Sequence, residues 1–214
     1  MTVAGLGRDW ALDWVRRSAA TVDEHRVELI TLDREIGDGD HGENLDRGFQ
    51  AVLGKLDGVA DDATPGDVLK LVATTLISTV GGAAGPLYGT AYLKGAVAAG
   101  SAPELDAAAV AAVLTAARDG IVSRGKAESG DKTMVDAWTP AVEAADAAVA
   151  AGSDAAGVLA AAAKAAADGA VATDPLVARK GRASYLGERS AGHRDPGAQS
   201  TAYLLAAAAA AAED

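Results

Sequence analysis

The chain contains no cysteine, which excludes disulfide bonds, Cys-ligated zinc, iron–sulfur clusters and thiol nucleophiles. Aromatic residues are scarce, at 4% of 214 residues, so the core must be built mostly from alanine, valine and leucine. Basic residues are outnumbered: 19 Lys and Arg stand against 30 Asp and Glu, and the net charge is −11. Because a protein that binds duplex DNA usually has the opposite balance, the composition argues against nucleic acid as the main partner.

Long hydrophobic runs are also missing. No apolar stretch reaches membrane-spanning length without a charge or a glycine, and the alanine run at 206–212 is only seven residues long. The N-terminal residues carry charge early and lack the apolar centre of a signal peptide. We therefore expect a soluble, cytoplasmic protein with one domain over residues 1–214.

The alanine-rich segments favour helix, because alanine has the best intrinsic helix propensity, and the alternating pattern of strands is almost absent. The sequence predicts an all-α fold of about eight helices. The expected helices span 9–32, 44–56, 64–79, 88–99, 103–123, 133–150, 153–171 and 197–212.

Four gaps between these helices differ in composition from the rest of the chain. They cover 32–44, 81–89, 124–134 and 172–197, where glycine, charged and hydroxyl residues largely replace alanine. Loops held by a rigid scaffold usually carry function, so four such loops predict one shared site. The last is longer than most connections in compact domains, which indicates a functional cover.

The first gap holds a dense group of carboxylates. Asp33, Asp38 and Asp40 are hard oxygen ligands suited to magnesium or calcium, and neighbouring glycines let them converge. An EF-hand is excluded, because a loop starting at Asp38 places Phe49 where the bidentate glutamate belongs. A solvated acidic turn is the alternative. His41 has three possible roles: a phosphate donor, a partner of a carboxylate, or a surface histidine.

The third gap nearly matches a phosphate-binding P-loop, but Asp131 stands between Gly130 and Lys132, where the pattern requires lysine directly after glycine. The segment before it also looks helical, so a P-loop nucleotide hydrolase is rejected. Asp131 is instead expected to cap a helix that begins near Thr133, and a helix start can still receive a phosphate.

The remaining gaps are consistent with a phosphate ligand. The glycine cluster at 81–85 lets a ligand approach the backbone, although a simple helix–helix turn is an equal alternative. The fourth gap carries Lys180, Arg182, Arg189 and Arg194, and arginine binds phosphate well, although a solvated basic loop is the alternative. Together the residues favour a nucleotide di- or triphosphate bridged by a metal, without identifying the base, the acceptor or the reaction.

Taken in order, the four gaps resemble the ADP-binding L subunit of bacterial dihydroxyacetone kinase (the DhaL family). The motifs that carry the resemblance are LDREIGDGDHGEN, GGAAGPLYG, GDKTM followed by Pro140, and KGRASYLGERSxGHxDPGAxS, and it runs from about Trp10 to Leu205. The resemblance implies a closed barrel of about eight antiparallel helices with the nucleotide at one rim.

The resemblance also implies roles for individual residues. Asp33, Asp38 and Asp40 would hold two Mg²⁺ ions that bridge the phosphates of ADP or ATP, with Asp38 and Arg182 acting in catalysis. The nucleotide-binding residues it implies are His41, Gly42, Glu43, Asn44, Ala83, Ala84, Gly125, Met134, Arg182, Asp195, Pro196 and Gly197. Ala84 stands where relatives often carry serine, so a hydroxyl contact is lost and the backbone N–H is left to serve.

The implied activity is phosphoryl transfer by a subunit that is inactive alone. An M subunit of the phosphotransferase system would rephosphorylate bound ADP, and the phosphoryl group would pass to dihydroxyacetone held on a separate K subunit. One alternative is a component of an ATP-dependent kinase for a related sugar or acyl acceptor. Another is a nucleotide-state sensor that docks on a transcription regulator, and a purely structural helical domain is the last.

Overall fold

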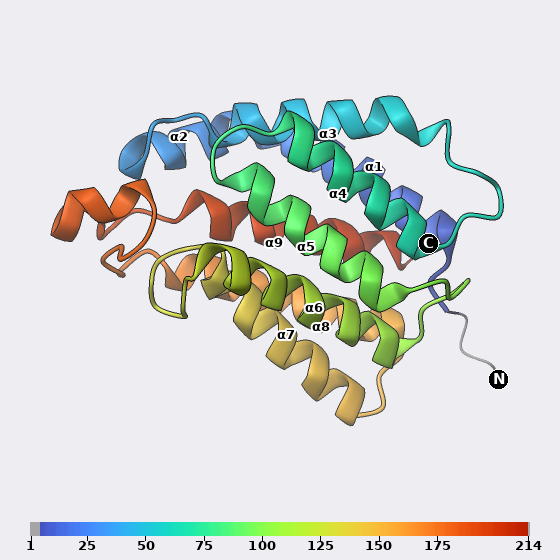
Figure 1. Ribbon diagram of the computed structural model, residues 1–214. Helices are drawn as coiled ribbons and strands as arrows, with labels where there is room; N and C mark the ends of the chain where they lie inside the picture. The colour runs from blue at the N-terminus through green and yellow to red at the C-terminus, as the bar shows by residue number, and fades with distance from the viewer. Residues whose placement is uncertain (1–4, 214) are drawn as a thin grey trace.

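The computed structural model describes residues 5–213, and within them the chain forms nine α-helices and one 3-10 segment, η1 (Figure 1). The elements are α1 (Arg8–Glu24), α2 (Arg26–Ile36), α3 (His41–Leu56), α4 (Pro65–Thr79), α5 (Ala84–Ala99), α6 (Ala107–Gly125), α7 (Val135–Ala150), α8 (Ala155–Ala172), η1 (Arg182–Ser190) and α9 (Pro196–Ala211). The only strand-like pairing in this part of the chain is a single bridge between Leu6 and Leu105. The predicted all-α class is therefore confirmed.

Eight of the helices form a closed ring. Contacts join α1 to α3 and then run in order through α4, α5, α6, α7 and α8 to α9, which contacts α1 again. The chain direction alternates from one helix of the ring to the next, as the colours in Figure 1 show. The expected antiparallel barrel is present, and α2 lies outside the ring against α3, α9 and η1.

Two tryptophans of α1 close the ring onto α9. Trp10 Nε1 donates to Ala208 O at 3.1 Å and Trp14 Nε1 donates to Leu204 O at 2.9 Å, and the two indoles stack with their centroids 5.3 Å apart. Both tryptophans are buried, so each indole contributes apolar area and satisfies its polar N–H at the same time.

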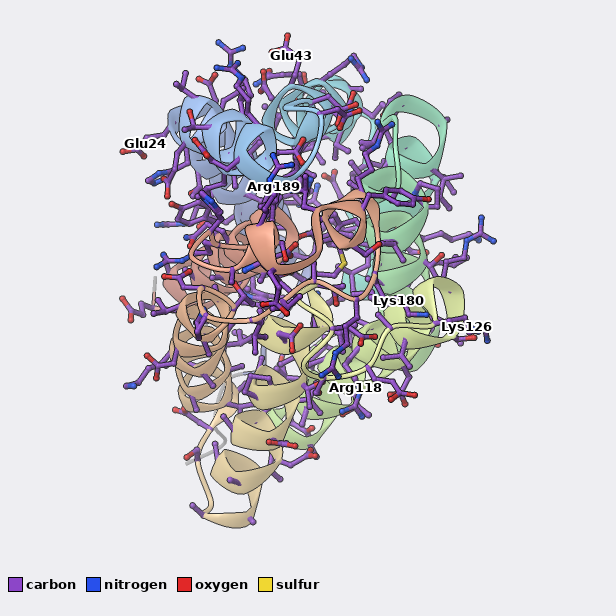
Figure 2. All side chains as sticks on the ribbon, turned by 90° about the vertical axis from the view of Figure 1, so that its left-hand side faces the viewer. Glu24, Glu43, Arg118, Lys126, Lys180 and Arg189 are labelled. Atoms are coloured by element: carbon purple, nitrogen blue, oxygen red, sulfur yellow. The ribbon has the colours of Figure 1, made fainter. Side chains whose placement is uncertain are left out.

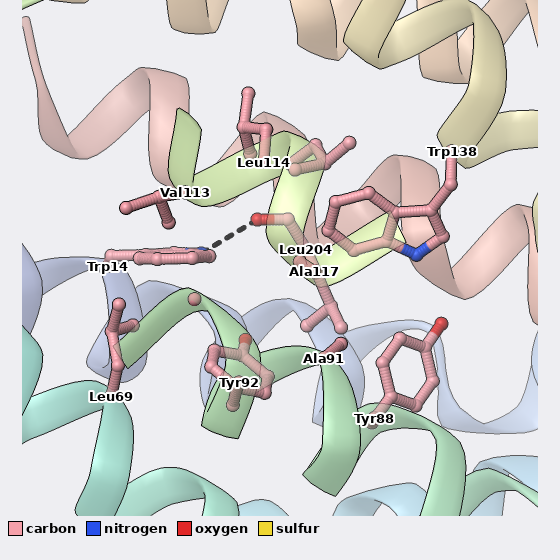
Figure 3. Close-up of a pocket in the computed structure, with 12 residues that line it drawn as sticks. Trp14, Leu69, Tyr88, Ala91, Tyr92, Val113, Leu114, Ala117, Trp138 and Leu204 are labelled. Atoms are coloured by element: carbon pink, nitrogen blue, oxygen red, sulfur yellow. Dashed lines mark hydrogen bonds between the residues drawn. The ribbon is translucent and has the colours of Figure 1, made fainter. Parts of the chain in front are cut away.

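Four aromatic residues meet in the interior of the barrel (Figure 3). Trp14, Tyr88, Tyr92 and Trp138 surround a residual apolar cavity of about 20 Å³, with leucine, valine and alanine side chains completing its wall. A cavity of this size has room for about one water molecule, so the barrel is a packed core and not a channel.

The largest difference from the sequence expectation is at the N-terminus, where one helix was expected over 9–32. The structure instead ends α1 at Glu24 and starts α2 at Arg26, with His25 between them. The His25 ring stacks on Tyr203 of α9, and Glu28 accepts hydrogen bonds from both side chains, at 2.9 Å and 2.6 Å. Because no glycine or proline marks this break, the cause is tertiary contact.

Helix α8 is long and apolar enough, by length and composition, to cross a membrane. It packs between α7 and α9 and places Val158 and Leu159 in the core. Those contacts are typical of a core helix in a bundle.

Candidate functional site

The alternating direction of the ring helices brings the four glycine-rich loops to one end of the barrel, at the left of Figure 1 and facing the viewer in Figure 2. The helices α3, α5, α7 and α9 all begin at this rim. A helix N-terminus carries a positive partial charge, and the start of α5 has no side-chain cap, so the rim favours an anionic ligand.

The three predicted metal ligands come together at this rim. Asp33, Asp38 and Asp40 each offer one carboxylate oxygen, and these oxygens lie within 4.8 Å of one another. Asp33, on α2, is 9% exposed, and its Oδ2 accepts from the backbone N–H of Asp40 at 2.8 Å and of His41 at 3.1 Å, so it caps α3. Three close carboxylates repel one another unless a cation balances them, and an all-oxygen set suits Mg²⁺.

Arg182 of η1 reaches the same cluster. Its Nη1 lies 2.9 Å from Asp38 Oδ2, and both side chains are accessible, at 69% and 37% exposure. The guanidinium therefore lies beside the carboxylates and is open to solvent.

The start of α5 forms a backbone cradle opposite the carboxylates. Gly81 and Gly82 lead into Ala83, the N-cap residue, and no side chain caps this helix. A Cβ built on Gly81 would lie 3.2 Å from Asn44 Oδ1, and one on Gly82 would lie 4.0 Å from Asp40 Oδ1. Side chains here would fill the space between the α5 N-terminus and the acidic cluster, which glycine leaves open to a phosphate.

His41 lies below the cluster and is only 9% exposed. Its Nε2 is 2.9 Å from Ser200 Oγ, which in turn is 2.6 Å from the hydroxyl of Tyr88. Burial lowers the pKa of His41, although Asp33 and Asp40 favour its charged form. Of the roles considered from the sequence, a surface histidine is therefore wrong: the ring belongs to a buried network that joins α3, α5 and α9.

The cleft above these groups has a volume of about 210 Å³. Its lining residues are Asp33, Ile36, Gly37, Asp38, Asp40, His41, Asn44, Gly81, Gly82, Ala83, Ala84, Leu87, Lys132, Thr133, Met134, Lys180, Gly181, Arg182, Ala183, Asp195, Pro196 and Gly197. Most residues that the resemblance implied are among them. A second hollow of about 290 Å³ adjoins it, shares Ala83 and Met134, and adds the apolar Ile121, Ala127 and Val135.

Three of the expected nucleotide-binding residues lie outside the first cleft. Gly42 faces α2, where an added Cβ would collide with the backbone carbonyl of Arg26. Glu43 points to solvent and pairs with Arg26 at 2.8 Å. Gly125 lines the adjoining apolar hollow. Gly42 thus serves helix packing, because α2 and α3 approach too closely for a side chain.

The basic residues of the fourth loop divide in the same way. Lys180 and Arg182 line the cleft, whereas Arg194 forms two 3.0 Å contacts with Asp174 and a third with Gln199. Arg189 is exposed on η1, away from the lining residues. Only half of the arginine and lysine side chains that were expected to clamp phosphate therefore face the cleft.

The loop before α7 contradicts one expectation directly. Asp131 does not cap α7, whose N-cap residue is Met134. Its carboxylate instead accepts from Glu128 N at 2.9 Å, within the loop, and Asp136 accepts from Thr133 N at 2.8 Å. The helix begins two residues later than predicted and has no side-chain cap, and Asp136 of its first turn binds the preceding loop at Thr133 N.

Several residues that line the cleft are absent from the set that the resemblance implied. Gly81 and Gly82 lie in the glycine cluster at 81–85, so their composition was the available signal. Leu87 and Lys132 lie in the motifs GGAAGPLYG and GDKTM, but nothing within those motifs singles out either residue. Lys132 is 1% exposed, which its place in a polar loop does not predict.

Asp195 completes the site at the start of α9. Its carboxylate accepts from Ala198 N at 2.7 Å and so caps the helix. Burial raises the pKa of Asp195 to about 7, and the carboxylates of Asp136 and Asp33 add to the increase while Lys132 opposes it. The group titrates near neutrality because it is largely withdrawn from water.

Comparisons with known proteins identify the family and the fold of this chain. The DAK2 domain model matches residues 35–210. The ADP-binding subunit DhaL of the PEP-dependent dihydroxyacetone kinase of Escherichia coli (strain K12) is 43% identical over 209 residues, which cover 98% of this chain and 99% of that protein. The ADP-binding subunit DhaL of PEP-dependent dihydroxyacetone kinase 1 of Listeria innocua serovar 6a is 44% identical over 204 residues, 92% of this chain and 93% of that protein.

The fold also matches a solved structure. The dihydroxyacetone kinase from C. freundii in complex with AMP-PNP and Mg²⁺ superposes with a TM-score of 0.70 at 24% identity, covering 98% of this chain and 35% of that one. That likeness shows the fold. The matched domain and the near full-length relatives above 40% identity together show that this chain belongs to the DhaL family of DAK2-domain proteins.

Proposed function

We propose that this protein is the ADP-binding subunit of a dihydroxyacetone kinase and a single nucleotide-binding domain. In this role it relays a phosphoryl group from an M-type donor of the phosphotransferase system, through its bound nucleotide, to dihydroxyacetone on a separate K subunit. The names of its relatives support the kinase assignment. The observation that carries the proposal is the convergence of three carboxylates within 4.8 Å, in one cleft with an uncapped helix N-terminus.

The phosphates and the base of a nucleotide would bind in different parts of the site. Asp33, Asp38 and Asp40 would hold two Mg²⁺ ions, and the backbone N–H groups of Ala83 and Ala84 would bind phosphate oxygens. The adenine ring would occupy the apolar hollow, which Gly125 and Met134 line. Bound magnesium neutralises phosphate charge as the phosphoryl group is transferred.

In this proposal the residues of the chain position the reactants and form no covalent bond with them. Phosphoryl transfer needs alignment and charge neutralisation, with little covalent chemistry from the protein. Asp38 would hold magnesium beside the phosphates, and Arg182 would move from Asp38 onto the phosphoryl oxygens. Asp195 to Gly197 begin α9 and line the cleft, where Gly197 contributes a helix N–H group, because Pro196 has none and the Asp195 N–H donates to Thr173 Oγ1. The attacking hydroxyl arrives with the K subunit.

The other roles expected from the sequence remain proposals of the same site. A component of an ATP-dependent kinase for a related sugar or acyl acceptor would use the same cleft, with ATP as an exchanging substrate. A nucleotide-state sensor would dock the same rim on a transcription regulator. A cytoplasmic location fits each of these roles.

Nucleotide content tests the proposal. The protein is purified from cells, dialysed extensively and denatured, and the released nucleotide and magnesium are quantified. Near-stoichiometric ADP supports a resident cofactor and the relay from a phosphotransferase donor. An empty protein that exchanges ATP freely supports the ATP-dependent alternative. A protein that binds neither nucleotide with Mg²⁺ contradicts both.

A further inference from the structure

A lysine lies buried under the segment that covers one side of the cleft. We call residues 174–194 the cover: they leave α8, include η1 and return to α9. Lys132, in the loop before α7, is 1% exposed. Lysine is almost never fully buried unless its charge is paired or hydrogen-bonded, so the local structure must satisfy this ammonium group.

The ammonium group of Lys132 binds both ends of the cover. Nζ donates to Thr173 O at 2.6 Å and to Asp174 O at 3.3 Å, where the chain leaves α8. It also donates to the carbonyl of His193, where the chain returns to α9. An ammonium has three donors and no acceptor, so three carbonyl partners use all of its hydrogen-bonding capacity and require its protonated form.

Backbone conformation alone does not explain why Lys132 is buried. Lys132 adopts φ 62°, in the left-handed region that side chains other than glycine rarely enter. Lys126, in the same loop, has φ 53° but is exposed (Figure 2). The left-handed conformation alone therefore does not bury a lysine here, and the three carbonyl groups are what separate the two residues.

The surrounding charges also favour the ammonium form. Burial lowers the pKa of Lys132, whereas Asp195, Asp174 and Asp136 each oppose that change. The side chain thus stays a donor beside carboxyl groups from three different segments.

Other hydrogen bonds join the two ends of the cover to each other, and its middle has one backbone bond to the 126–134 loop, from Arg179 N to Asp131 O at 3.0 Å. At its return end, His193 Nδ1 also lies 3.6 Å from Glu35 Oε2 of α2. Gly192 N donates to Asp174 O at 2.7 Å, and Asp195 N donates to Thr173 Oγ1 at 3.0 Å. Lys132 instead joins both ends to the loop at 126–134, which carries part of the cleft wall. The cover in turn carries Arg182, whose Nη1 lies 2.9 Å from Asp38 Oδ2.

We propose that Lys132 is a positioning residue that fixes the cover to the 126–134 loop and so sets where Arg182 meets the phosphates of the bound nucleotide. The second half of this role rests on the proposed function. Lys132 is not a phosphate ligand, because its three donors are already used by carbonyl groups.

The test compares two lysine variants of the full chain. Lys132→Met removes the donors and keeps an unbranched side chain, and Lys126→Met is the matched control in the same loop. Hydrogen exchange in peptides from the cover is expected to rise at least tenfold in Lys132→Met, with peptides from α1 and α4 unchanged. Dissociation of a fluorescent ADP analogue with Mg²⁺ is expected to accelerate at least tenfold. Both quantities should stay within twofold in Lys126→Met.

A double variant tests whether Lys132 acts through Arg182. In an Arg182→Met background, Lys132→Met is expected to accelerate nucleotide dissociation less than twofold, because the group that it positions is already gone. An equal acceleration in both backgrounds would overturn positioning through Arg182 and leave only a general effect on the fold.

The outcomes separate this inference from the proposed function. Unchanged exchange in the cover overturns the role of Lys132 even where ADP binds normally. A wild-type protein that fails to bind ADP overturns the proposed function, while hydrogen exchange in the cover still tests whether Lys132 fixes the cover. If Lys132→Met does not fold, nitrogen NMR of the lysine side chains in the wild-type protein replaces it. A protected Lys132 ammonium signal is expected, and exchange as fast as that of exposed lysines overturns the role of Lys132.

Discussion

Arg182 and Asp38, which lie on the cover and on the loop before α3, form an ion pair with Nη1 and Oδ2 2.9 Å apart. Both side chains are largely accessible to solvent, and an exposed pair of this kind contributes about 0–1 kcal/mol to stability. The arginine can therefore leave the carboxylate for a phosphate at little cost. The ion pair therefore contributes little to the stability of the fold and leaves the guanidinium available to a ligand.

Arg182→Met is expected to lower phosphoryl transfer at least about 100-fold, because an arginine that neutralises a transferring phosphoryl group contributes at least that much. The midpoint of thermal unfolding should hardly change, since the pair is exposed. Arg189→Met is the matched control, because Arg189 is exposed on the same segment and does not line the cleft. A reconstituted assay with K and M subunits measures transfer, and equal loss in both variants would contradict the role of Arg182.

Asp38→Asn is expected to abolish transfer while leaving the helical fold intact, because it removes one carboxylate from a set whose oxygens lie within 4.8 Å. Calorimetric titration with Mg²⁺ in the presence of ADP should show weaker metal binding. Asp62→Asn, at an exposed residue far along the chain, serves as the control. Full activity of Asp38→Asn would rule out a metal site at this cluster.

Gly42→Ala is expected to destabilise the protein by about 1–3 kcal/mol, because the new Cβ would collide with the Arg26 carbonyl and lie 3.1 Å from Ile30 Cγ1. Gly54→Ala, on the same helix, has no neighbour within 4 Å and should be stabilising by about 0.5–1 kcal/mol. Urea unfolding measures both. A neutral Gly42→Ala would show that α2 can move away from α3 without cost.

Asp195 makes stability depend on pH in a defined direction. Folding raises its pKa from 3.8 to about 7, so between these values the folded state holds a proton that the unfolded state has released. The free energy of unfolding contributed by this group therefore falls as the pH rises from about 4 to about 7, and is level above that.

Asp195→Asn removes this titration and keeps an oxygen acceptor for the Ala198 N–H. Between pH 5 and pH 8, in a chelator, wild type is expected to lose up to about 2–3 kcal/mol relative to the variant. Denaturant unfolding at the two pH values gives the difference. A constant difference between wild type and Asp195→Asn would show that the carboxylate does not titrate in this range.

The helices were accessible to sequence reasoning for a local reason. Alanine-rich stretches have high helix propensity, and the segments at 64–79 and 153–171 were placed within about two residues. The break at His25 was not, because it depends on Tyr203 and Glu28, and neither the stacking nor the shared carboxylate leaves a local pattern.

The site divides along the same line. Asp33, Asp38 and Asp40 lie within eight positions of one another, so their spacing already predicted a cluster. Lys132 belongs to one of the four polar gaps, but nothing in that composition indicates a buried lysine, because its partners Thr173 and His193 lie far along the chain. Only a packed structure can bring those carbonyl groups to one ammonium.

Helix propensity and residue spacing are enough to predict a helical protein with four polar loops, one of which holds three carboxylates. These features depend on a few neighbouring residues. Tertiary packing is needed to explain why Gly42 lies too close to α2 for a side chain, why Glu43 pairs with Arg26 and why Arg182 pairs with Asp38. Such choices depend on which segments pack side by side, and that information lies in the closure of the helical ring and not in any local stretch of the chain.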